Sequence, residues 1–311
     1  MMKCLVTGGA GFIGSNIARE ALRRGHGVRI LDDFSTGRRS NLDDIAGDVD
    51  LLEGDLRNYE TVTRAVEGVE VVFHEGALPS VPRSISDPVA SNAVNVDGSV
   101  NVLRAAHQAG CRRVLFASSS SIYGDAPEEV KSEDLPPRPL SPYAVAKMAA
   151  ERYFQVFHRI YGLETVALRY FNVFGPYQDP DSPYSAVIPL FVKAVSQGKP
   201  PLIHGSGKQS RDFTFIDNVV NANFLAAEAT GAPGMVMNVA CGGSISVNRL
   251  ASDISRMMGA TGIEPVHGPK RPGDVMNSLA DISLAREVLG YSPTVGFEEG
   301  LASTISYLTG I

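Results

Sequence analysis

The sequence predicts an α/β fold built on a doubly wound parallel sheet, with a second, smaller α/β lobe. Two observations lead to this expectation. Short apolar runs alternate with longer amphipathic stretches through the first half of the chain, and an order of strand, helix and strand implies a parallel sheet with helices on both faces. A glycine-rich turn also follows the first apolar run and opens a helical pattern, as it does in many sheets of this kind.

Each expected strand of the sheet is a short apolar run. These runs are 3–7, 28–31, 49–53, 69–74, 113–117 and 165–170. The helical patterns between them include 12–24, 88–108 and 142–161. Because crossovers between parallel strands are right-handed, a Rossmann-like fold is the natural arrangement of these elements.

The alternation breaks after residue 171, where Gly175-Pro176 and residues 179–183 form a turn-rich stretch. Patterns at 213–216, 217–229 and 235–239 predict that the chain then returns to the sheet. Further helical patterns cover 186–197, 248–258, 281–289 and 297–308. We therefore expect a larger domain of residues 1–171 and 211–240, and a smaller lobe of residues 172–210 and 241–311.

The composition is that of an ordinary globular protein. The 311 residues are 44% hydrophobic and 20% charged, so they can bury a substantial core. The net charge of -6 argues against a general nucleic-acid binder, which would need a basic face. No apolar run approaches the length of a membrane span, and the apolar N-terminal segment is too short for a signal peptide.

The cysteines and histidines predict no metal site. Cys4, Cys111 and Cys241 are far apart and lack the spacing of metal ligands, which suits a reduced, cytoplasmic protein. Cys4 and Cys111 border apolar runs, so we expect their thiols to be buried. The six histidines are scattered without ligand spacing.

The turn from Thr7 to Gly14 has the pattern G-x-x-G-x-x-G. We expect Gly8 to permit the tight turn, Gly11 to let a phosphate approach the backbone, and Gly14 to let helix and strand pack closely. Backbone amides at the start of the following helix can hold a pyrophosphate. The turn therefore predicts a dinucleotide site.

Acidic residues after the second strand indicate which dinucleotide binds. Asp32 and Asp33 stand where a carboxylate accepts hydrogen bonds from the adenosine ribose. A carboxylate there repels a 2′-phosphate, so NAD is favoured over NADP, although Arg38 and Arg39 lie nearby. Asp55, after the third strand, either reaches the adenine edge or caps a helix, and the two roles are compatible.

Tyr143 and Lys147 stand one turn apart on one face of the predicted helix 142–161. A tyrosine with its ordinary pKa of about 10 is a poor base at neutral pH. We expect the Lys147 ammonium, together with the positive nicotinamide ring of NAD+, to lower the pKa of Tyr143. The pair can then remove a proton from a substrate hydroxyl while hydride leaves the same carbon.

Four consecutive serines, residues 118–121, follow the fifth strand at the edge where a parallel sheet presents its ligands. One serine there can hydrogen-bond a substrate hydroxyl and shape the path of its proton. For most of the four, a polar junction between strand and loop is an equally good interpretation.

Three motifs together carry a family resemblance: T-G-G-A-G-F-I-G, S-S-S-x-x-Y-G-D and S-P-Y-x-x-x-K. The chain resembles the extended short-chain dehydrogenase/reductase family and, within it, the UDP-hexose 4-epimerases. The motifs occur in the right order and the similarity covers nearly the whole chain. The resemblance implies an NAD-dependent enzyme with Ser119, Tyr143 and Lys147 as catalytic residues. Ser120 is the neighbour to test if Ser119 proves wrong.

The resemblance also implies an NAD site in the larger domain and a nucleotide-sugar site in the lobe. The residues implied at the NAD site are Gly8, Gly11, Phe12, Ile13, Gly14, Asp32, Asp33, Ser35, Thr36, Gly37, Asp55, Leu56, Asn95, Tyr143, Lys147 and Tyr170. The residues implied at the nucleotide-sugar site are Ser120, Asn172, Val187, Arg211, Arg271, Asp274 and Ser278.

Several of these residues bear on which sugar nucleotide is the substrate. Arg211 and Arg271 lie in segments resembling those that hold the diphosphate, and arginine offers a planar fork of donors to phosphate. Asp274 could accept hydrogen bonds from the ribose. Ser278 matches a position that is a bulky tyrosine in epimerases limited to plain hexoses and small in relatives that accept N-acetylhexosamines. The resemblance thus implies UDP-N-acetylglucosamine and UDP-N-acetylgalactosamine, or UDP-glucose and UDP-galactose, as substrates.

The expected reaction is inversion of C4 through a 4-keto sugar. Related dehydratases and decarboxylases carry an acid just after the catalytic serine or threonine, whereas Ser120 and Ser121 stand there in this chain. A UDP-glucuronate 4-epimerase or decarboxylase on the same scaffold stays an alternative, as does a non-catalytic NAD(H)-binding regulatory protein. The family further implies a homodimer in which 88–108 and 142–161 of two subunits pack as a four-helix bundle.

Overall fold

The computed structural model describes residues 2–182, 185–260, 262–270 and 275–310. Within these residues, seven parallel strands form the central sheet in the order β12-β7-β5-β4-β1-β2-β3. The strands are β1 (Lys3–Thr7), β2 (Gly27–Asp32), β3 (Val49–Glu53), β4 (Val71–His74), β5 (Arg113–Ser119), β7 (Glu164–Tyr170) and β12 (Val236–Val239). The order reverses between β1 and β4, so the prediction of a doubly wound Rossmann-like sheet is confirmed.

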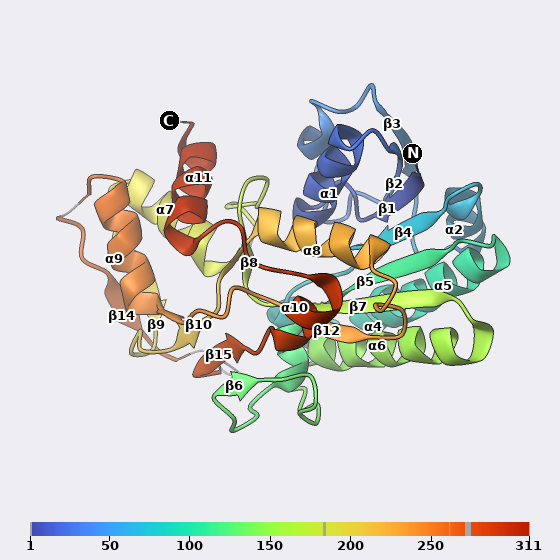
Figure 1. The fold of residues 1–311 in the computed structure, drawn as a ribbon. Coiled ribbons are helices and arrows are strands. Elements are labelled where there is room, and N and C mark those ends of the chain that lie inside the picture. The colour runs from blue at the N-terminus through green and yellow to red at the C-terminus, as the bar shows by residue number, and fades with distance from the viewer. Residues whose placement is uncertain (1, 183–184, 261, 271–274, 311) are drawn as a thin grey trace.

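Alternate residues of the inner strands enter different cores, so both faces of the sheet are buried except along the edge strand β3. Cys4 and Val6 of β1 pack with α1 and α8, whereas Leu5 packs with α2, α5 and α6. Figure 1 shows the two sets of helices on opposite sides of the sheet. Their bounds are α1 (Phe12–Arg23), α8 (Ile216–Glu228), α2 (Tyr59–Val66), α5 (Gly98–Gln108) and α6 (Pro142–Tyr161). This double burial explains why the strands are almost continuously apolar.

Helix α6 begins and ends where the sequence predicts. The Ser141 hydroxyl accepts a hydrogen bond from the Ala144 backbone N–H (3.2 Å), and Pro142 occupies the first turn. The helix ends at Gly162, whose φ of 71° is the left-handed conformation typical of such a position. Because the helix starts beside the carboxyl end of β5, Tyr143 in its first turn lies at the functional edge of the sheet.

The predicted helix 88–108 contains a π-helical turn. The elements α4 (Pro88–Asn92), η2 (Ala93–Asp97) and α5 follow one another without a break, and η2 is the π-helical part. Such turns add one residue to a helix and occur often near functional sites. In this chain the π turn carries the buried side chain of Asn95.

The prediction that 213–216 returns to the central sheet is wrong. The residues form β11 (Thr214–Phe215), which pairs with β8 (Val173–Phe174). Asn172 has a left-handed backbone with φ of 37° just after β7, and this turns the chain out of the sheet. The Thr214 N–H then bonds to the Asn172 carbonyl (3.3 Å). The second expected strand, observed as β12, does join the sheet, beside β7.

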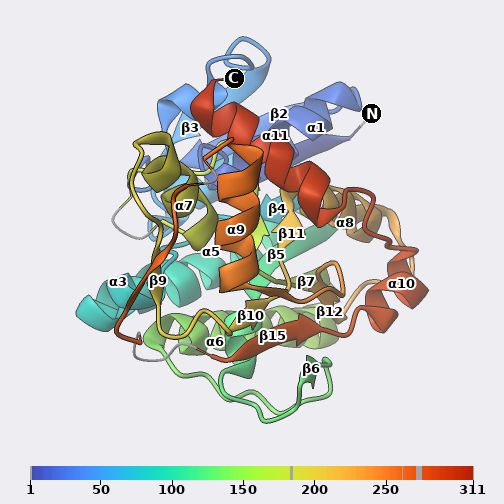
Figure 2. The same cartoon turned by 90° about the vertical axis from the view of Figure 1, so that its left-hand side faces the viewer.

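A smaller lobe stands beside the sheet, where Figure 1 shows α7, α9 and α11 gathered and Figure 2 shows them from the side. Its helices are α7 (Val187–Ser196), α9 (Val247–Met257) and α11 (Phe297–Thr309), whereas α10 (Ser283–Leu289) packs against β12 and α8 of the larger domain. Its main sheet has the order β13-β10-β15-β6, and the bounds are β13 (Ile245–Ser246), β10 (Ser210–Arg211), β15 (Asn277–Ala280) and β6 (Val130–Lys131). Strand β6 comes from the first half of the chain, so the lobe draws on a segment that we expected in the larger domain.

Candidate active site

A cavity of about 960 Å³ opens at the carboxyl ends of β1, β2, β4, β5 and β7. A second cavity of about 560 Å³ extends from it into the lobe, between α7, β9 (Leu202–His204) and β10. The residues that line both cavities are Ser80, Tyr143, Asn172, Val173, Ala186 and Arg211. The larger cavity lies where the strand order reverses, which is the position at which such sheets bind ligands.

The glycine turn forms one wall of the larger cavity. Gly8 has a φ of 66°, and a side chain on it would meet the Gly76 Cα at 2.7 Å. A side chain on Gly14 would lie 2.2 Å from the Gly8 carbonyl oxygen, so helix α1 can approach the turn only without one. The predicted residues Gly8, Gly11, Phe12, Ile13 and Gly14 all line the cavity. The start of α1 therefore faces the space that a pyrophosphate would need.

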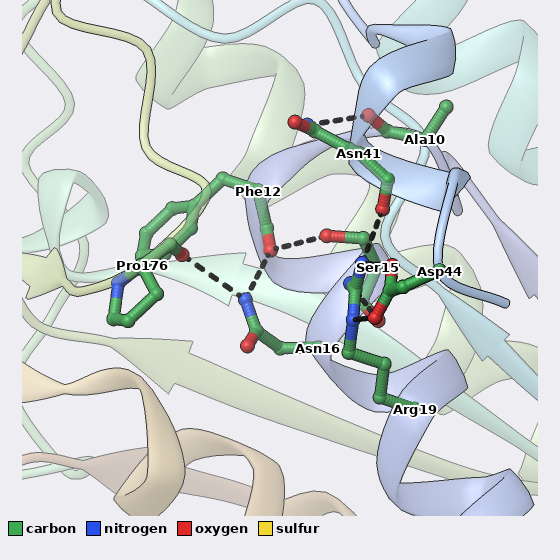
Figure 3. Close-up of polar contacts among 8 residues, drawn as sticks. All are labelled: Ala10, Phe12, Ser15, Asn16, Arg19, Asn41, Asp44 and Pro176. Atoms are coloured by element: carbon green, nitrogen blue, oxygen red, sulfur yellow. Dashed lines mark hydrogen bonds and ion pairs between the residues drawn. The ribbon is translucent and has the colours of Figure 1, made fainter. Parts of the chain in front are cut away.

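Polar side chains hold this turn in place, as Figure 3 shows. Asn41 donates to the Ala10 carbonyl (2.9 Å), and Arg19 donates to the Asn41 carbonyl (2.7 Å). Asn16 donates to the carbonyls of Phe12 (2.8 Å) and Pro176 (3.3 Å). The last bond ties the start of α1 to the segment after β8, which lies 160 residues further along the chain.

The adjacent acids after β2 have different surroundings. Asp32 is buried, and its carboxylate accepts backbone N–H bonds from Ala10 (2.9 Å) and Phe34 (2.8 Å). Burial raises the pKa of Asp32, while these two bonds lower it. Asp33 is more exposed and accepts bonds from the Ser35 N–H (2.9 Å) and hydroxyl (2.6 Å). Asp32 thus orders the glycine turn from behind, and both carboxylates line the cavity.

Of the neighbouring predicted residues, Ser35 and Thr36 line the cavity and Gly37 does not. A side chain on Gly37 would lie 2.8 Å from the Asp32 carboxylate. Its lack of one lets the loop fold against that carboxylate.

The two arginines near this site are occupied by carboxylates. Arg38 forms an ion pair with Asp179 (2.5 Å), and Arg39 forms one with Glu53. Each guanidinium therefore already has an anionic partner. This arrangement agrees with a ribose that lacks a 2′-phosphate, and hence with NAD.

Asp55 and Leu56 line the cavity as predicted, but the capping role considered for Asp55 is wrong. Asn58 caps α2, since its side chain accepts a bond from the Thr61 N–H (3.0 Å). Asp55 instead accepts bonds from the Arg57 backbone N–H (2.8 Å) and guanidinium. These bonds hold the pKa of Asp55 below its usual range.

Ser119, Tyr143 and Lys147 meet in the larger cavity. The Lys147 Nζ donates to the Ala117 carbonyl at 2.7 Å and lies 6.0 Å from the centre of the Tyr143 ring. A side-chain hydrogen bond joins Ser119 and Tyr143. Strand β5 and helix α6 thus bring the three predicted residues together.

The pKa of Tyr143 differs from our expectation. Burial raises the pKa to about 12; the hydrogen bond with Ser119 lowers it and the negative charge of Glu75 raises it. The Lys147 ammonium is not among the groups that shift this pKa, and it donates to the Ala117 carbonyl. Burial also lowers the pKa of Lys147 itself. A further positive charge beside the phenol is therefore needed to form tyrosinate at neutral pH.

The four consecutive serines at the end of β5 have different hydrogen-bond partners. Ser118 borders the cavity but is buried, and its hydroxyl donates to the Glu151 carboxylate (2.7 Å). Glu151 forms a buried ion pair with Arg169 (2.7 Å) beneath the site. The Ser119 hydroxyl accepts bonds from the Ser121 N–H (3.2 Å) and hydroxyl (2.9 Å). Ser120 lines the cavity.

Asn95 of the predicted NAD set does not line the cavity. Its amide accepts a bond from the Leu78 N–H (2.8 Å) and donates to the Leu78 carbonyl (3.1 Å) and the Ser91 hydroxyl (3.3 Å). Leu78 belongs to the cavity wall. Asn95 therefore supports that wall from behind, which is the polar core contact rather than the direct contact we expected.

The cavity also contains a residue that sequence reasoning missed, Glu75, directly after β4. Its Oε1 accepts a hydrogen bond from the Tyr170 hydroxyl (2.9 Å), and that hydroxyl accepts one from the Asn223 amide (2.8 Å). Burial raises the pKa of Glu75, while Tyr170 and the positive charge of Lys147 lower it. The available signal was an acid at the end of an apolar strand, immediately before Gly76.

The predicted substrate residues gather where the two cavities meet. The Asn172 amide donates to the Asp212 carbonyl (3.2 Å) and the Ser278 hydroxyl (3.4 Å). Arg211 pairs with Ser278 between β10 and β15. Val187, the first residue of α7, lines the smaller cavity. The predicted residues Arg271 and Asp274 lie outside the described residues.

Asp212 anchors this end of the site. Its buried carboxylate accepts backbone N–H bonds from Cys241 (3.0 Å), Gly242 (3.0 Å) and Ala280 (3.3 Å). Burial raises the pKa of Asp212 to about 6, while these bonds lower it. The carboxylate therefore holds two separate segments, residues 241–242 and Ala280, beside Arg211.

The described residues contain no cluster of three or more His, Cys, Asp or Glu side chains that could hold a metal ion. Among them, no helix is long and apolar enough to cross a membrane. Cys4 and Cys111 are buried, as predicted.

The chain matches one family and several characterised relatives. The NAD dependent epimerase/dehydratase family matches residues 4–240. A UDP-glucose 4-epimerase of Mycolicibacterium smegmatis is 40% identical over 98% of this chain and 98% of its own length.

Two solved structures share the whole fold. The UDP-N-acetylglucosamine 4-epimerase of Methanobrevibacter ruminantium, solved with UDP-N-acetylmuramic acid, has a TM-score of 0.94 and 40% identity and covers 99% of this chain and 98% of its own. The UDP-glucose 4-epimerase of Thermus thermophilus, solved with NAD, has a TM-score of 0.89 and 37% identity and covers 99% of both chains. A cavity with a glycine turn, an acid after β2 and a Ser-Tyr-Lys set fits the cofactor of these proteins.

Replacing Gly14 with alanine tests the packing of the glycine turn. The new methyl group would lie 2.2 Å from the Gly8 oxygen, so we expect the turn to shift and copurified NAD to be lost. Overpacking of this kind costs about 1–3 kcal/mol of unfolding free energy. Bound nucleotide and the unfolding midpoint would be measured.

Gly47→Ala is the matched control, because a side chain there meets nothing within 4 Å. It should keep both NAD and stability. Helix propensity alone would make Gly14→Ala stabilising, so a Gly14→Ala protein with normal NAD content and a raised midpoint would contradict the packing argument.

Proposed function

The chain belongs to the NAD dependent epimerase/dehydratase family, and we propose that it is a 4-epimerase of UDP-hexoses. The observation that carries the proposal is the meeting of Ser119, Tyr143 and Lys147 in one cavity beside the glycine turn. Relatives at 40% and 37% identity over the full length act on UDP-glucose or UDP-N-acetylglucosamine according to their names. We assign residues 1–171 and 211–240 to NAD binding, and residues 172–210 and 241–311 to the nucleotide-sugar.

Tyr143 is the proposed acid and base. When bound, NAD would supply a reversible hydride acceptor for the sugar carbon and a positively charged ring beside the phenol. Tyr143 removes the O4 proton and later gives it back. Ser119 holds the phenol by their hydrogen bond and lowers its pKa. Lys147 adds a positive charge on the same side of α6.

The two connected cavities suit a substrate that is anchored at one end and loose at the other. Arg211 and Asn172 stand at the junction, where they would hold the diphosphate, and Arg271 and Asp274 are proposed to join them. Val187 and the smaller cavity would take the nucleoside. The sugar would then lie in the larger cavity beside Ser120 and could turn over between the two hydride transfers. Inversion needs this freedom, because the hydride must return to the opposite face.

Ser278 is proposed to decide which sugar fits. Its hydroxyl bonds to Asn172 (3.4 Å) and it lines the larger cavity. A side chain of this size leaves room for an acetamido group, so we propose UDP-N-acetylglucosamine and UDP-N-acetylgalactosamine as substrates, with UDP-glucose and UDP-galactose also accepted. The serines after Ser119 supply no carboxyl group for elimination, which disfavours dehydration and decarboxylation.

We also propose a homodimer in the cytoplasm. Large apolar side chains are exposed along α3 (Val81–Ser86), α4 and α6, including Val89 at 77% and Ile160 at 67%. The contacts of α6 with α3 and α4 place these side chains on one side of the molecule. Exposed apolar side chains on packed helices are typical of a protein interface, and a second copy would bury them as a four-helix bundle.

The first test offers UDP-glucose, UDP-N-acetylglucosamine and UDP-glucuronate separately to the purified enzyme without added NAD. We expect the C4 epimers of the first two. Tyr143→Phe should lower turnover at least about a hundredfold, because a general base is lost. Formation of no epimer from any of the three, or a near-normal rate in Tyr143→Phe, would contradict the proposal. Conversion of UDP-glucuronate alone would favour the glucuronate alternative.

Ser278→Tyr tests the sugar preference. The larger side chain should lower kcat/KM for UDP-N-acetylglucosamine by at least about tenfold, a typical effect of pocket size, while UDP-glucose is still converted. Ser278→Ala keeps the space and should retain activity on both sugars. Equal activity of the tyrosine variant on both sugars would show that this residue does not set the preference.

Val89→Asp and Ile160→Asp test the interface. Each places a charge on the exposed apolar side of α4 or α6, so we expect sedimentation to report a monomer where the wild type is a dimer. Leu51→Asp is the control, because Leu51 is exposed on β3, away from these helices. A wild-type monomer, or a dimer in both interface variants, would contradict the proposal.

A further inference from the structure

The Glu75 carboxylate is only half satisfied. Its Oε1 accepts the Tyr170 hydroxyl bond (2.9 Å), but Oε2 is shielded from solvent and has no hydrogen-bond partner among the described residues. A buried charged oxygen without a partner is costly in a folded protein. A glutamine could accept the Tyr170 bond equally well through its amide oxygen. The hydrogen bond therefore does not explain why an acid stands here.

The negative charge of Glu75 acts on the ionisable groups around it. Lys147 and Glu75 interact electrostatically, and the charge of Glu75 also raises the pKa of Tyr143 and Tyr170. Its neighbour His74 bonds to Thr7 and Ser99, and burial lowers the pKa of His74 to about 3, so this ring is neutral. Glu75 thus brings a negative charge to the part of the larger cavity that contains Tyr143 and Lys147, the proposed proton-transfer residues.

We propose that Glu75 is a positioning residue whose negative charge makes this cavity end favour the oxidised cofactor over the reduced one. The nicotinamide ring is positively charged in NAD+ and neutral in NADH. A carboxylate in the same low-dielectric cavity stabilises the first form and not the second. The charge also offsets Lys147, which would otherwise repel the oxidised ring. Glu75 takes no part in proton transfer and acts through the electrostatic field around these groups.

This preference would serve a reaction in which the cofactor is reduced and must be reoxidised within one turnover. An enzyme that stabilised NADH would let the keto sugar accumulate and escape. A bias toward NAD+ drives the hydride back to the sugar and restores the enzyme. This benefit to turnover rests on the proposed function, whereas the preference for NAD+ itself does not. The test below reads cofactor binding alone, so its result does not depend on which sugar, if any, is converted.

The test compares Glu75→Gln with wild type. Purified enzyme is incubated with mixtures of NAD+ and NADH until the bound cofactor has exchanged, free cofactor is removed by gel filtration, and the bound ratio is read from the NADH absorbance and the total nucleotide. We expect Glu75→Gln to bind relatively more NADH by about tenfold, the effect of one nearby charge. Glu75→Asp keeps the charge and should stay within about threefold of wild type, a small fraction of that effect.

Glu133→Gln is the matched control. Glu133 is also partly buried, and its Oε1 accepts a hydrogen bond from the Asn238 N–H (2.7 Å), but it does not line the cavity. Its replacement should leave the bound ratio unchanged. An unchanged ratio in Glu75→Gln, or equal shifts in the Gln and Asp variants, would overturn the proposal.

If Glu75→Gln does not fold, the same ratio of bound cofactor is measured on wild-type enzyme as a function of pH. Protonation neutralises Glu75 as the pH falls through about 7, so the bound ratio must move toward NADH. Protonation of Lys147 over a higher range acts in the same direction, because it adds positive charge beside the oxidised ring. A ratio that does not depend on pH across this range would therefore refute the proposal.

Discussion

A buried ammonium at the edge of a parallel sheet is the constraint on which this site depends. Lys147 is held by the Ala117 carbonyl at 2.7 Å, and burial alone would drive it to lose its proton. The negative charge of Glu75 opposes that loss. Tyr143 feels the same burial, and its pKa rises to about 12. A positive charge beside Tyr143, such as the ring of the oxidised cofactor, would lower this pKa and favour proton transfer.

The sheet provides the rigid support that such a balance needs. Alternation along β5 sends Ser118 to the buried Glu151–Arg169 pair and leaves Ser119 facing Tyr143. Removing one member of a buried ion pair leaves an uncompensated charge, which is strongly destabilising. The elements that carry Ser119 and Tyr143 are thus tied together through the buried Glu151–Arg169 pair, which does not line the cavity.

In the lobe, single polar side chains hold the site together, because each binds segments that are distant in the sequence. Asp212 binds the backbone of two segments, and Asn172 bonds to both Asp212 and Ser278. Asn172 also has the left-handed backbone that turns the chain out of the sheet. One residue therefore redirects the chain and lines the junction of the two cavities.

The sequence by itself determined the features that depend on short-range rules. The glycine turn follows from Gly8 and Gly14, and the placement of Tyr143 and Lys147 follows from a helix with clear start and stop signals. Only the tertiary structure decided how buried each group is and which distant residue it meets. Glu75 and the pairing of β11 with β8 therefore escaped prediction. Likewise, the raised pKa of Tyr143 reflects burial, which no local spacing of residues encodes.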